Sequence, residues 1–163
     1  MKLDPSNARW HCLRFTDLSV TALQHIYAAR QAVFVLEQRC FYLDVDGWDE
    51  QAWHLAAWLP EHRLPLAYAR LFPPGVKYPE ASIGRVLTTE PVRGQGWGKL
   101  LIEHALAHSA ALFNRSALRI SAQAHLERFY GGFGFHALGE PYLEDGIPHI
   151  EMRRAAVHPT IKP

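Results

Sequence analysis

The sequence predicts an α/β fold in which one mixed sheet carries helices on both faces. Along the 163 residues, segments with the period of a strand alternate with segments with the period of a helix. A glycine-rich turn, RGQGWG, lies between one such strand and the helix that follows it. This order of elements is typical of a sheet covered by helices, and the length suffices for one hydrophobic core.

The expected elements cover most of the chain. Ser19 is a candidate N-cap, because its hydroxyl can accept a hydrogen bond from the first turn of a following helix. Asp145-Gly146 suits a tight turn between the last two strands. We expect a single domain over residues 1–154 and a loose tail over 155–163. The strands are expected over residues 10–16, 53–59, 64–72, 82–89, 117–123, 134–142 and 147–154, and the helices over residues 20–36, 98–113 and 124–133.

The composition argues against several classes of partner. The formal net charge is +1 with histidine neutral, so it indicates no basic surface for nucleic acid or for an anionic membrane. No apolar run approaches the ~18 residues that span a bilayer. The two distant cysteines, Cys12 and Cys40, are typical of reduced thiols, and the ten histidines are scattered. We therefore predict a cytoplasmic protein that binds neither nucleic acid nor membrane nor a metal ion.

The turn RGQGWG, residues 93–98, lacks what two familiar phosphate-binding motifs require. A Walker A loop ends in Gly-Lys-Ser/Thr, but Gly98-Lys99 is followed by Leu100. A dinucleotide fingerprint needs its third glycine where Lys99 stands. The remaining pattern is Arg-x-x-Gly-x-Gly at a helix start, where converging N–H groups suit a pyrophosphate without a metal. A glycine-rich turn without a ligand is the alternative.

A second landmark lies downstream, in SAQAHLERFYGGFGF, residues 121–135. RGQGWG and FYGGFGF together resemble the pyrophosphate loop and the Tyr-x-x-x-Gly-Phe element of the GNAT superfamily of acetyl-CoA-dependent N-acetyltransferases. The stretches VFVLEQRCFYLDVDG, IGRV and YLEDGIPHIEMRR add a resemblance to its ElaA-like branch. The resemblance implies a mostly antiparallel central sheet of about seven strands, splayed between strands 4 and 5.

The resemblance also implies where acetyl-CoA binds. The strand before the loop would hold the pantetheine arm through backbone groups, as an added strand does, and the loop would hold the pyrophosphate. Packing or an adenine edge is the expected role of the Trp97 side chain, and a solvated position is the alternative for Lys99. The implied cofactor residues are Val86, Leu87, Thr88, Arg93, Gly94, Gln95, Gly96, Trp97, Gly98 and Lys99.

Acetyl transfer from a thioester to an amine needs a proton acceptor and a proton donor. The resemblance assigns the donor to Tyr130, whose phenol would protonate the departing thiolate; aromatic packing is its alternative. The acceptor is open among His149, Glu144, Asp145 and Glu37. His149 opens the last expected strand, and the ordinary pKa of histidine suits proton transfer near neutral pH.

The segment CFYLDVDGWDEQ gathers acidic and aromatic residues after the first expected helix. In GNAT folds this region shapes the acceptor site, so an acidic, aromatic rim would favour a cationic amine. The expected acceptor residues are Glu37, Tyr42, Asp44 and Asp46. A calcium loop does not fit, because its position-12 glutamate is missing. A plain solvated acidic loop is the alternative.

The leading hypothesis for function is an N-acetyltransferase that passes an acetyl group from acetyl-CoA directly to a small-molecule or peptide amine. A non-catalytic acyl-CoA-binding or sensing module stays open. An acyl-homoserine-lactone-type synthase would need a basic patch for an acyl-carrier partner, and the sequence shows no such run. The identity of the acceptor and the oligomeric state, a homodimer included, also stay open.

Overall fold

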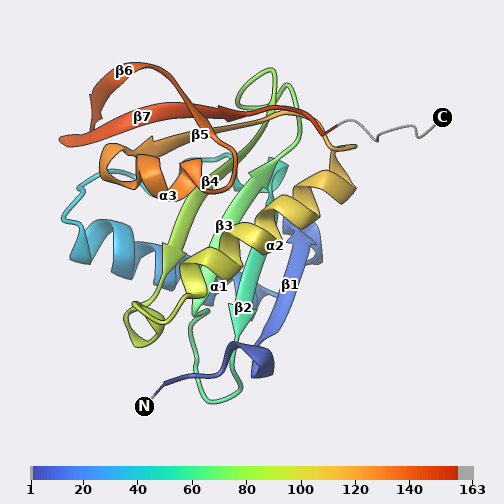
Figure 1. Ribbon diagram of the computed structural model, residues 1–163. Coiled ribbons are helices and arrows are strands. Elements are labelled where there is room, and N and C mark those ends of the chain that lie inside the picture. The colour runs from blue at the N-terminus through green and yellow to red at the C-terminus, as the bar shows by residue number, and fades with distance from the viewer. Residues whose placement is uncertain (1, 158–163) are drawn as a thin grey trace.

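The computed structural model describes residues 2–157, whose strands form one sheet in the order β1-β2-β3-β4-β5-β7-β6 (Figure 1). Only β4 and β5 are parallel neighbours. The expected mixed, mostly antiparallel sheet of seven strands is confirmed. The strands are β1 (Arg9–Arg14), β2 (Trp53–Trp58), β3 (Ala67–Phe72), β4 (Ala81–Thr88), β5 (Leu118–Gln123), β6 (His136–Glu144) and β7 (Ile147–Arg154), and the α-helices are α1 (Val20–Arg30), α2 (Trp97–Leu112) and α3 (Glu127–Gly131).

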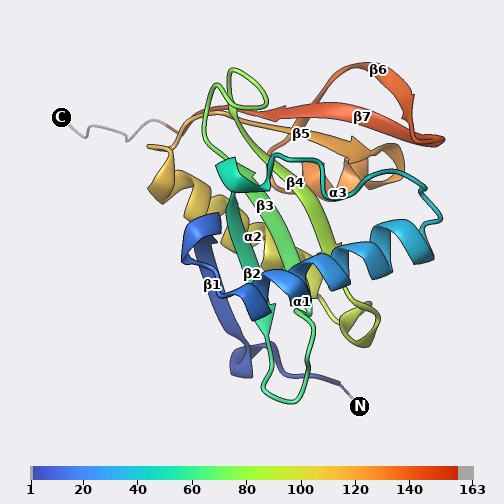
Figure 2. The same ribbon diagram turned by 180° about the vertical axis from the view of Figure 1, so that it is seen from behind.

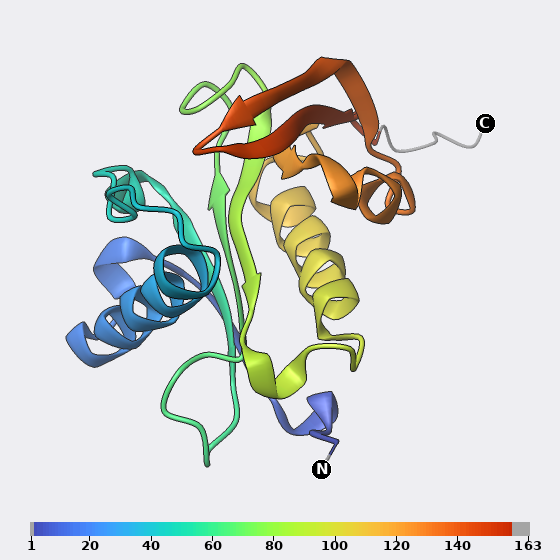
Figure 3. The ribbon, with the colours of Figure 1, turned by 90° about the vertical axis from the view of Figure 1, so that its left-hand side faces the viewer.

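The helices cover both faces of the sheet. Figures 1 and 2 show α2 and α3 on one face and α1 on the other, and Figure 3 shows the layers from the side. Because successive side chains of a strand point to opposite faces, the central strands supply two cores. The core under α1 contains Ile26, Phe34, Ala56, Tyr68 and Leu87. The core under α2 and α3 includes Leu55, Ala69, Leu71, Trp97, Leu101, Tyr130 and Phe135.

β4 and β5 separate shortly after they begin. They pair only at Ala81–Leu118 and Ser82–Arg119. Beyond Ser82, therefore, the edge of β4 that faces β5 has no strand partner in the described part of the chain. This is the expected splay between strands 4 and 5, and it leaves backbone donors and acceptors of β4 open to a ligand.

The first helix differs from its predicted form. Its N-cap is confirmed, because the Ser19 hydroxyl accepts the amide of Ala22 at 3.1 Å. The α-helix ends at Arg30, however, and residues 31–37 form a π-helix. Its wider turn continues to Gln38, whose amide donates to the carbonyl of Val33. The i, i+3, i+4 pattern did not separate these two helix types, since both keep the same face toward the core.

The last two strands form a hairpin around the expected turn. Asp145 and Gly146 both have positive φ, 50° and 76°, as a two-residue type I′ turn requires. β6 begins at His136, two residues later than predicted, because Gly134 and Phe135 close the end of α3 through hydrogen bonds. Of the predicted tail, residues 155–157 are described, and Val157 donates its amide to the carbonyl of Arg115. The tail beyond Val157 lies outside the described residues. Within residues 2–157, no helix is both long and apolar enough to cross a membrane.

Candidate active site

A cavity of about 310 Å³ opens where β4 and β5 separate. One wall comes from β3, β4 and the loop between them, and the other comes from β5, α3 and the β6–β7 turn. The π-helix and the segment after it close a third side. The polar residues that line the cavity are Gln38, Tyr42, Arg70, Lys77, Tyr78, Ser82, Arg85, Ser121, Gln123, Tyr130, Glu144, Asp145 and His149.

The glycine-rich turn has the geometry of an anion site. Gly94 and Gly96 take positive φ values of 70° and 86°. Gly96 is the N-cap of α2, and because glycine has no side chain, it accepts no hydrogen bond from the amides of the first helical turn through one. In the described part of the chain, the amides of Gly94, Gly96, Trp97 and Gly98 donate to no protein acceptor. Converging free N–H groups at the positive end of a 16-residue helix suit a pyrophosphate, so these residues fit coenzyme A.

Gly98 has no structural requirement for glycine within the described chain. Its φ lies outside the positive region, and an added Cβ would meet no atom within 4 Å. Packing of the protein itself therefore does not require glycine at this position. We expect Gly98→Ala to raise the free energy of unfolding, by up to ~1 kcal/mol through helix propensity. The same change should weaken coenzyme A binding roughly 10-fold or more, because it hinders a charge-assisted hydrogen bond.

This result is measured by titration calorimetry with coenzyme A and by thermal unfolding. Ala107→Gly, at an exposed position of α2, is the matched control: it should destabilise the fold and leave coenzyme A affinity unchanged. Equal coenzyme A affinity for Gly98→Ala and the unmodified protein would place the cofactor elsewhere.

The other residues expected at the cofactor differ in what their side chains do. Trp97 is fully buried and stacks on Trp10 with ring centroids 6.5 Å apart, so its side chain packs the core. The side-chain oxygen of Gln95 accepts a hydrogen bond from the backbone amide of Leu3, and its side-chain nitrogen donates one to the carbonyl of Pro91. Lys99 is 70% exposed and lies 3.8 Å from Glu103, an ordinary i, i+4 pair.

The β4 residues expected at the cofactor lie beside the open edge. Val86 lines the cavity, while Leu87 is buried under α1. The Thr88 carbonyl accepts a hydrogen bond from Arg93 Nε at 3.1 Å. Arg93 also pairs with Glu37 at 2.6 Å. Glu37 therefore lies at the cofactor turn, and it is not among the residues that line the cavity.

Tyr130 lines the cavity from α3. The residue is 6% exposed, and its hydroxyl has no hydrogen-bond partner within residues 2–157. Burial raises the pKa of Tyr130 to about 12. At neutral pH the phenol therefore keeps its proton, as a proton donor requires.

His149 and Glu144 face each other across the β6–β7 hairpin. His149 Nδ1 lies 2.8 Å from the carbonyl oxygen of Ile147, which can only accept, so Nδ1 carries the hydrogen. In the neutral ring Nε2 is then the nitrogen with the lone pair, and it lies 4.0 Å from Glu144 Oε2. Glu144 also accepts a hydrogen bond from Ser121 on β5 at 3.1 Å. The structure thus brings two of the candidate proton acceptors together at one wall of the cavity.

A β-bulge shapes the middle of β4. Between the pairs Tyr68–Leu87 and Arg70–Gly84, β3 advances two residues and β4 advances three. The extra residue turns the backbone at Arg85, which has a φ of 51°. A non-glycine residue with positive φ is strained, and such strain persists only where surrounding contacts hold it.

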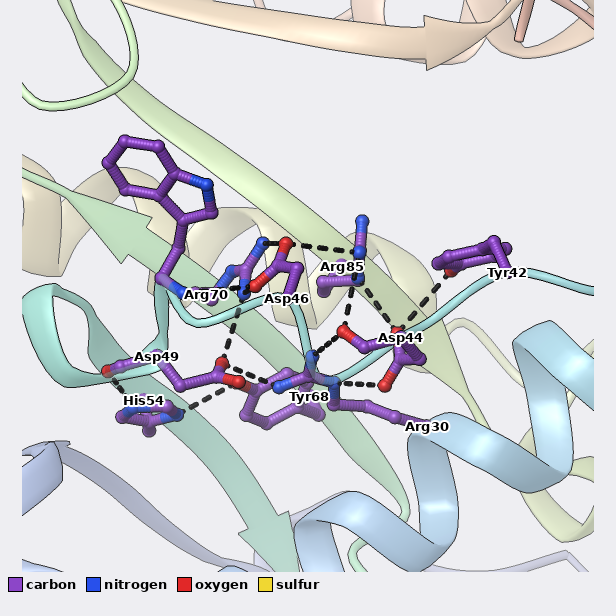
Figure 4. Close-up of polar contacts among 10 residues, drawn as sticks. Arg30, Tyr42, Asp44, Asp46, Asp49, His54, Tyr68, Arg70 and Arg85 are labelled. Atoms are coloured by element: carbon purple, nitrogen blue, oxygen red, sulfur yellow. Dashed lines mark hydrogen bonds and ion pairs between the residues drawn. The ribbon is translucent and has the colours of Figure 1, made fainter. Parts of the chain in front are cut away.

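Those contacts come from a buried ion cluster between α1, the residue 44–49 segment, β3 and β4 (Figure 4). Asp44 accepts from Arg30 at 2.8 Å and from Arg85 at 2.9 Å. Asp49 accepts from Arg30 at 2.6 Å and from Arg70 at 3.0 Å. The cluster consists of Arg30, Arg70, Arg85, Asp44, Asp46 and Asp49, so three positive and three negative charges balance.

Two further side chains complete the cluster on the β2 side. His54 Nε2 contacts the carbonyl oxygen of Asp49 at 2.9 Å, and its Nδ1 contacts the Tyr68 hydroxyl at 2.8 Å (Figure 4). Burial lowers the pKa of His54, so this ring stays neutral near pH 7.

This arrangement differs from the acidic rim that was expected around the acceptor site. Asp44 is 3% exposed, and Asp46 is bonded to both Arg70 and Arg85. Neither aspartate lines the cavity, and arginines of the cluster pair with both of them. The alternative of a solvated acidic loop is wrong for the same reason. Tyr42, in contrast, does line the cavity, and burial raises its pKa to about 12.

The cluster makes stability depend on pH. Burial tends to raise the pKa of Asp46, but hydrogen bonds and charge from Arg70 outweigh it, so the pKa lies below its usual value. A carboxylate with a lowered folded-state pKa stabilises the fold above the unfolded pKa of ~3.9 and loses that contribution as the pH falls through the folded value. We expect the free energy of unfolding to decrease below about pH 4 and Asp46→Asn to flatten this decrease.

Urea unfolding measured from about pH 7 to about pH 3 checks this expectation. Glu50→Gln is the control, because Glu50 is exposed and forms no ion pair within the described residues. An identical pH slope for Asp46→Asn and the unmodified protein would contradict a stabilising role of this carboxylate.

Sequence reasoning missed the arginines and the histidine of the cluster. Arg30, Arg70, Arg85 and His54 all interrupt apolar runs, namely YAARQAVF, LAYARLF, SIGRVL and WHLAAWL. A charged residue inside a run that is otherwise buried needs a buried counter-charge. The charged residues inside these apolar runs therefore indicated buried ion pairs, although the sequence alone does not show which aspartate pairs with which arginine.

The chain belongs to the GNAT acetyltransferase family, whose acetyltransferase (GNAT) domain matches residues 75–156. The UPF0039 protein sll0451 of Synechocystis sp. is 47% identical over 143 residues, which are 88% of this chain and 92% of that protein. A crystal structure of an acyl-CoA N-acyltransferase from Pseudomonas aeruginosa is 43% identical, with a TM-score of 0.86 over 91% of this chain and 99% of that one.

Within this family, the chain belongs to the ElaA-like branch. Protein ElaA of Escherichia coli is 37% identical over 150 residues, which cover 91% of this chain and 97% of that protein. The crystal structure of Escherichia coli ElaA matches with a TM-score of 0.83 over 90% of this chain and 99% of that one.

Proposed function

We propose that the protein transfers an acetyl group from acetyl-CoA directly to the amino group of a small molecule or peptide. The observation that carries the proposal is the cavity at the separation of β4 and β5, which gathers Tyr130, Glu144 and His149 beside an open strand edge. The similarity to an acyl-CoA N-acyltransferase of Pseudomonas aeruginosa supports the same class of reaction.

Acetyl-CoA, when bound, supplies the activated acetyl group as a thioester. The free N–H groups of the Gly94–Gly98 turn would bind its pyrophosphate, and the open edge of β4 from Val86 to Thr88 would pair with its extended arm. His149 Nε2 accepts a proton from the amine of the acceptor, and the nearby Glu144 carboxylate stabilises the positive imidazole that results. Tyr130 donates its proton to the departing sulfur.

The experiment that tests this proposal measures thiol release from acetyl-CoA with a broad panel of amines. We expect release to require both the protein and an amine, and the acetylated amine to form in equal amount. Tight coenzyme A binding without release for any amine would instead favour the non-catalytic sensing module.

A further inference from the structure

The two walls of the cavity carry opposite charges. On the sheet side lie Arg85 of β4 and Lys77 of the β3–β4 loop, and on the hairpin side lie Glu144 and Asp145 beside His149. Arg70 lines the cavity as well, but the aspartates of the buried cluster pair with both Arg70 and Arg85. Lys77 is therefore the cation of this wall that has no ion pair among the described residues. We infer that the acceptor is an aminocarboxylate, whose carboxylate binds Lys77 and Arg85 while its amine lies at His149. This inference rests on the proposed acetyl transfer.

Arg85 has one nitrogen left for a ligand. Its Nε and Nη2 donate to the buried aspartates, at 2.9 Å to Asp44 and 3.2 Å to Asp46. Its Nη1 has no hydrogen-bond partner in the described part of the chain, and Figure 4 shows a terminal nitrogen that points away from both carboxylates. The ion cluster therefore holds the guanidinium rigidly while two N–H donors remain free at the cavity wall.

Lys77 is the cation of that wall that forms no ion pair among the described residues. No carboxylate of the described residues lies within 4.0 Å of its ammonium. The ammonium lies 4.4 Å from the ring centroid of Trp48 and 5.9 Å from that of Phe72. These cation–π contacts restrain an otherwise mobile side chain at the mouth of the cavity, so its charge stays in position for an anionic group.

The same charges disfavour a purely cationic acceptor. A diamine would place its second ammonium against Lys77, whose charge has no ion-pair partner among the described residues, so the two like charges would repel. An amine that carries a carboxylate meets complementary charge at both ends. The acceptor class therefore follows from the charges outside the buried cluster, which are Lys77 on one wall and Glu144 and Asp145 on the other.

The test compares pairs of amines that differ only in a carboxylate: phenylalanine with 2-phenylethylamine, and lysine with 1,5-diaminopentane. We expect a higher kcat/KM for the aminocarboxylate of each pair. Lys77→Met should lower the ratio of the two kcat/KM values about 10-fold, because a charge-assisted contact is lost. Lys77→Arg should keep the ratio, and Lys77→Glu should reverse the preference toward 1,5-diaminopentane. The intrinsic reactivity of each amine is the same for every variant, so the ratios report on the protein.

Lys2→Met is the matched control, because it removes the same charge outside the cavity and should leave the ratios unchanged. A second measurement, calorimetric titration of phenylalanine and 2-phenylethylamine into the coenzyme A complex, does not depend on turnover. If amines are acetylated but the kcat/KM ratios are the same for the Lys77 variants and the unmodified protein, this inference is wrong and the proposed function still stands. If no amine is acetylated, the proposed function fails, and the titration still decides whether the cavity prefers the aminocarboxylate.

Discussion

Replacing Tyr130 by phenylalanine is expected to lower the turnover of amine acetylation by roughly 10²-fold, within the usual range for loss of a general acid. The substitution removes only the hydroxyl, which has no hydrogen-bond partner within residues 2–157, and keeps the ring packed against Phe135. Burial raises the pKa of this phenol to about 12, so near neutral pH it holds the proton that the departing sulfur would accept.

Steady-state kinetics and coenzyme A titration together check this result. Coenzyme A affinity should change little, because the turn at Gly94–Gly98 supplies the anion contacts. Tyr68→Phe is the control: this residue is fully buried and bonds His54 outside the cavity, so its change should lower stability and leave turnover per folded protein intact. A loss of coenzyme A affinity at unchanged turnover would make Tyr130 a binding residue only.

Replacing Arg30 by methionine is expected to lower the free energy of unfolding by about 3–5 kcal/mol, the range for breaking a buried ion pair by removing one partner. Arg30 is fully buried, and its guanidinium donates to Asp44 and Asp49. Methionine fills part of the volume but leaves both carboxylates with one arginine each. The uncompensated negative charge inside the protein, rather than the loss of packing, causes most of the expected effect.

Urea unfolding of Arg30→Met beside Lys99→Met measures this effect. Lys99 is 70% exposed in its pair with Glu103, so its loss should cost less than ~1 kcal/mol. Arg30→Lys should lie between the two, because an ammonium keeps the charge without the fork that reaches both aspartates. A similar small loss for Arg30→Met and Lys99→Met would show that the cluster contributes little to stability.

Local patterns predicted most of the fold. The apolar periods placed seven strands and three helices, and the turn residues Asp145-Gly146 placed the final hairpin, because such signals depend on neighbours along the chain. The π-helix over residues 31–37 was not predicted, since it keeps nearly the same apolar face as an α-helix. The late start of β6 depends on how Gly134 and Phe135 close α3, which the strand pattern does not contain.

The candidate site was predicted only in part. RGQGWG predicted an anion-binding turn from glycines and a helix start, two features that lie within a few residues of each other. The pairing of Glu37 with Arg93 joins segments 56 residues apart, and no local pattern indicates it. No local pattern indicates the tautomer of His149 either, because it depends on a contact with the carbonyl of Ile147 in the folded hairpin.

By itself, the sequence determined the order of the elements, the mixed sheet and the glycine-rich helix start, because backbone preferences and apolar periods act over short stretches of chain. Only the tertiary structure decided what the charged residues do. The sequence shows three acidic residues close together, at positions 44, 46 and 49. The fold brings Arg30, Arg70 and Arg85 within hydrogen-bond distance of them. The effect of a charge depends on its neighbours in space and on its exposure to water, and both are set when distant segments pack together.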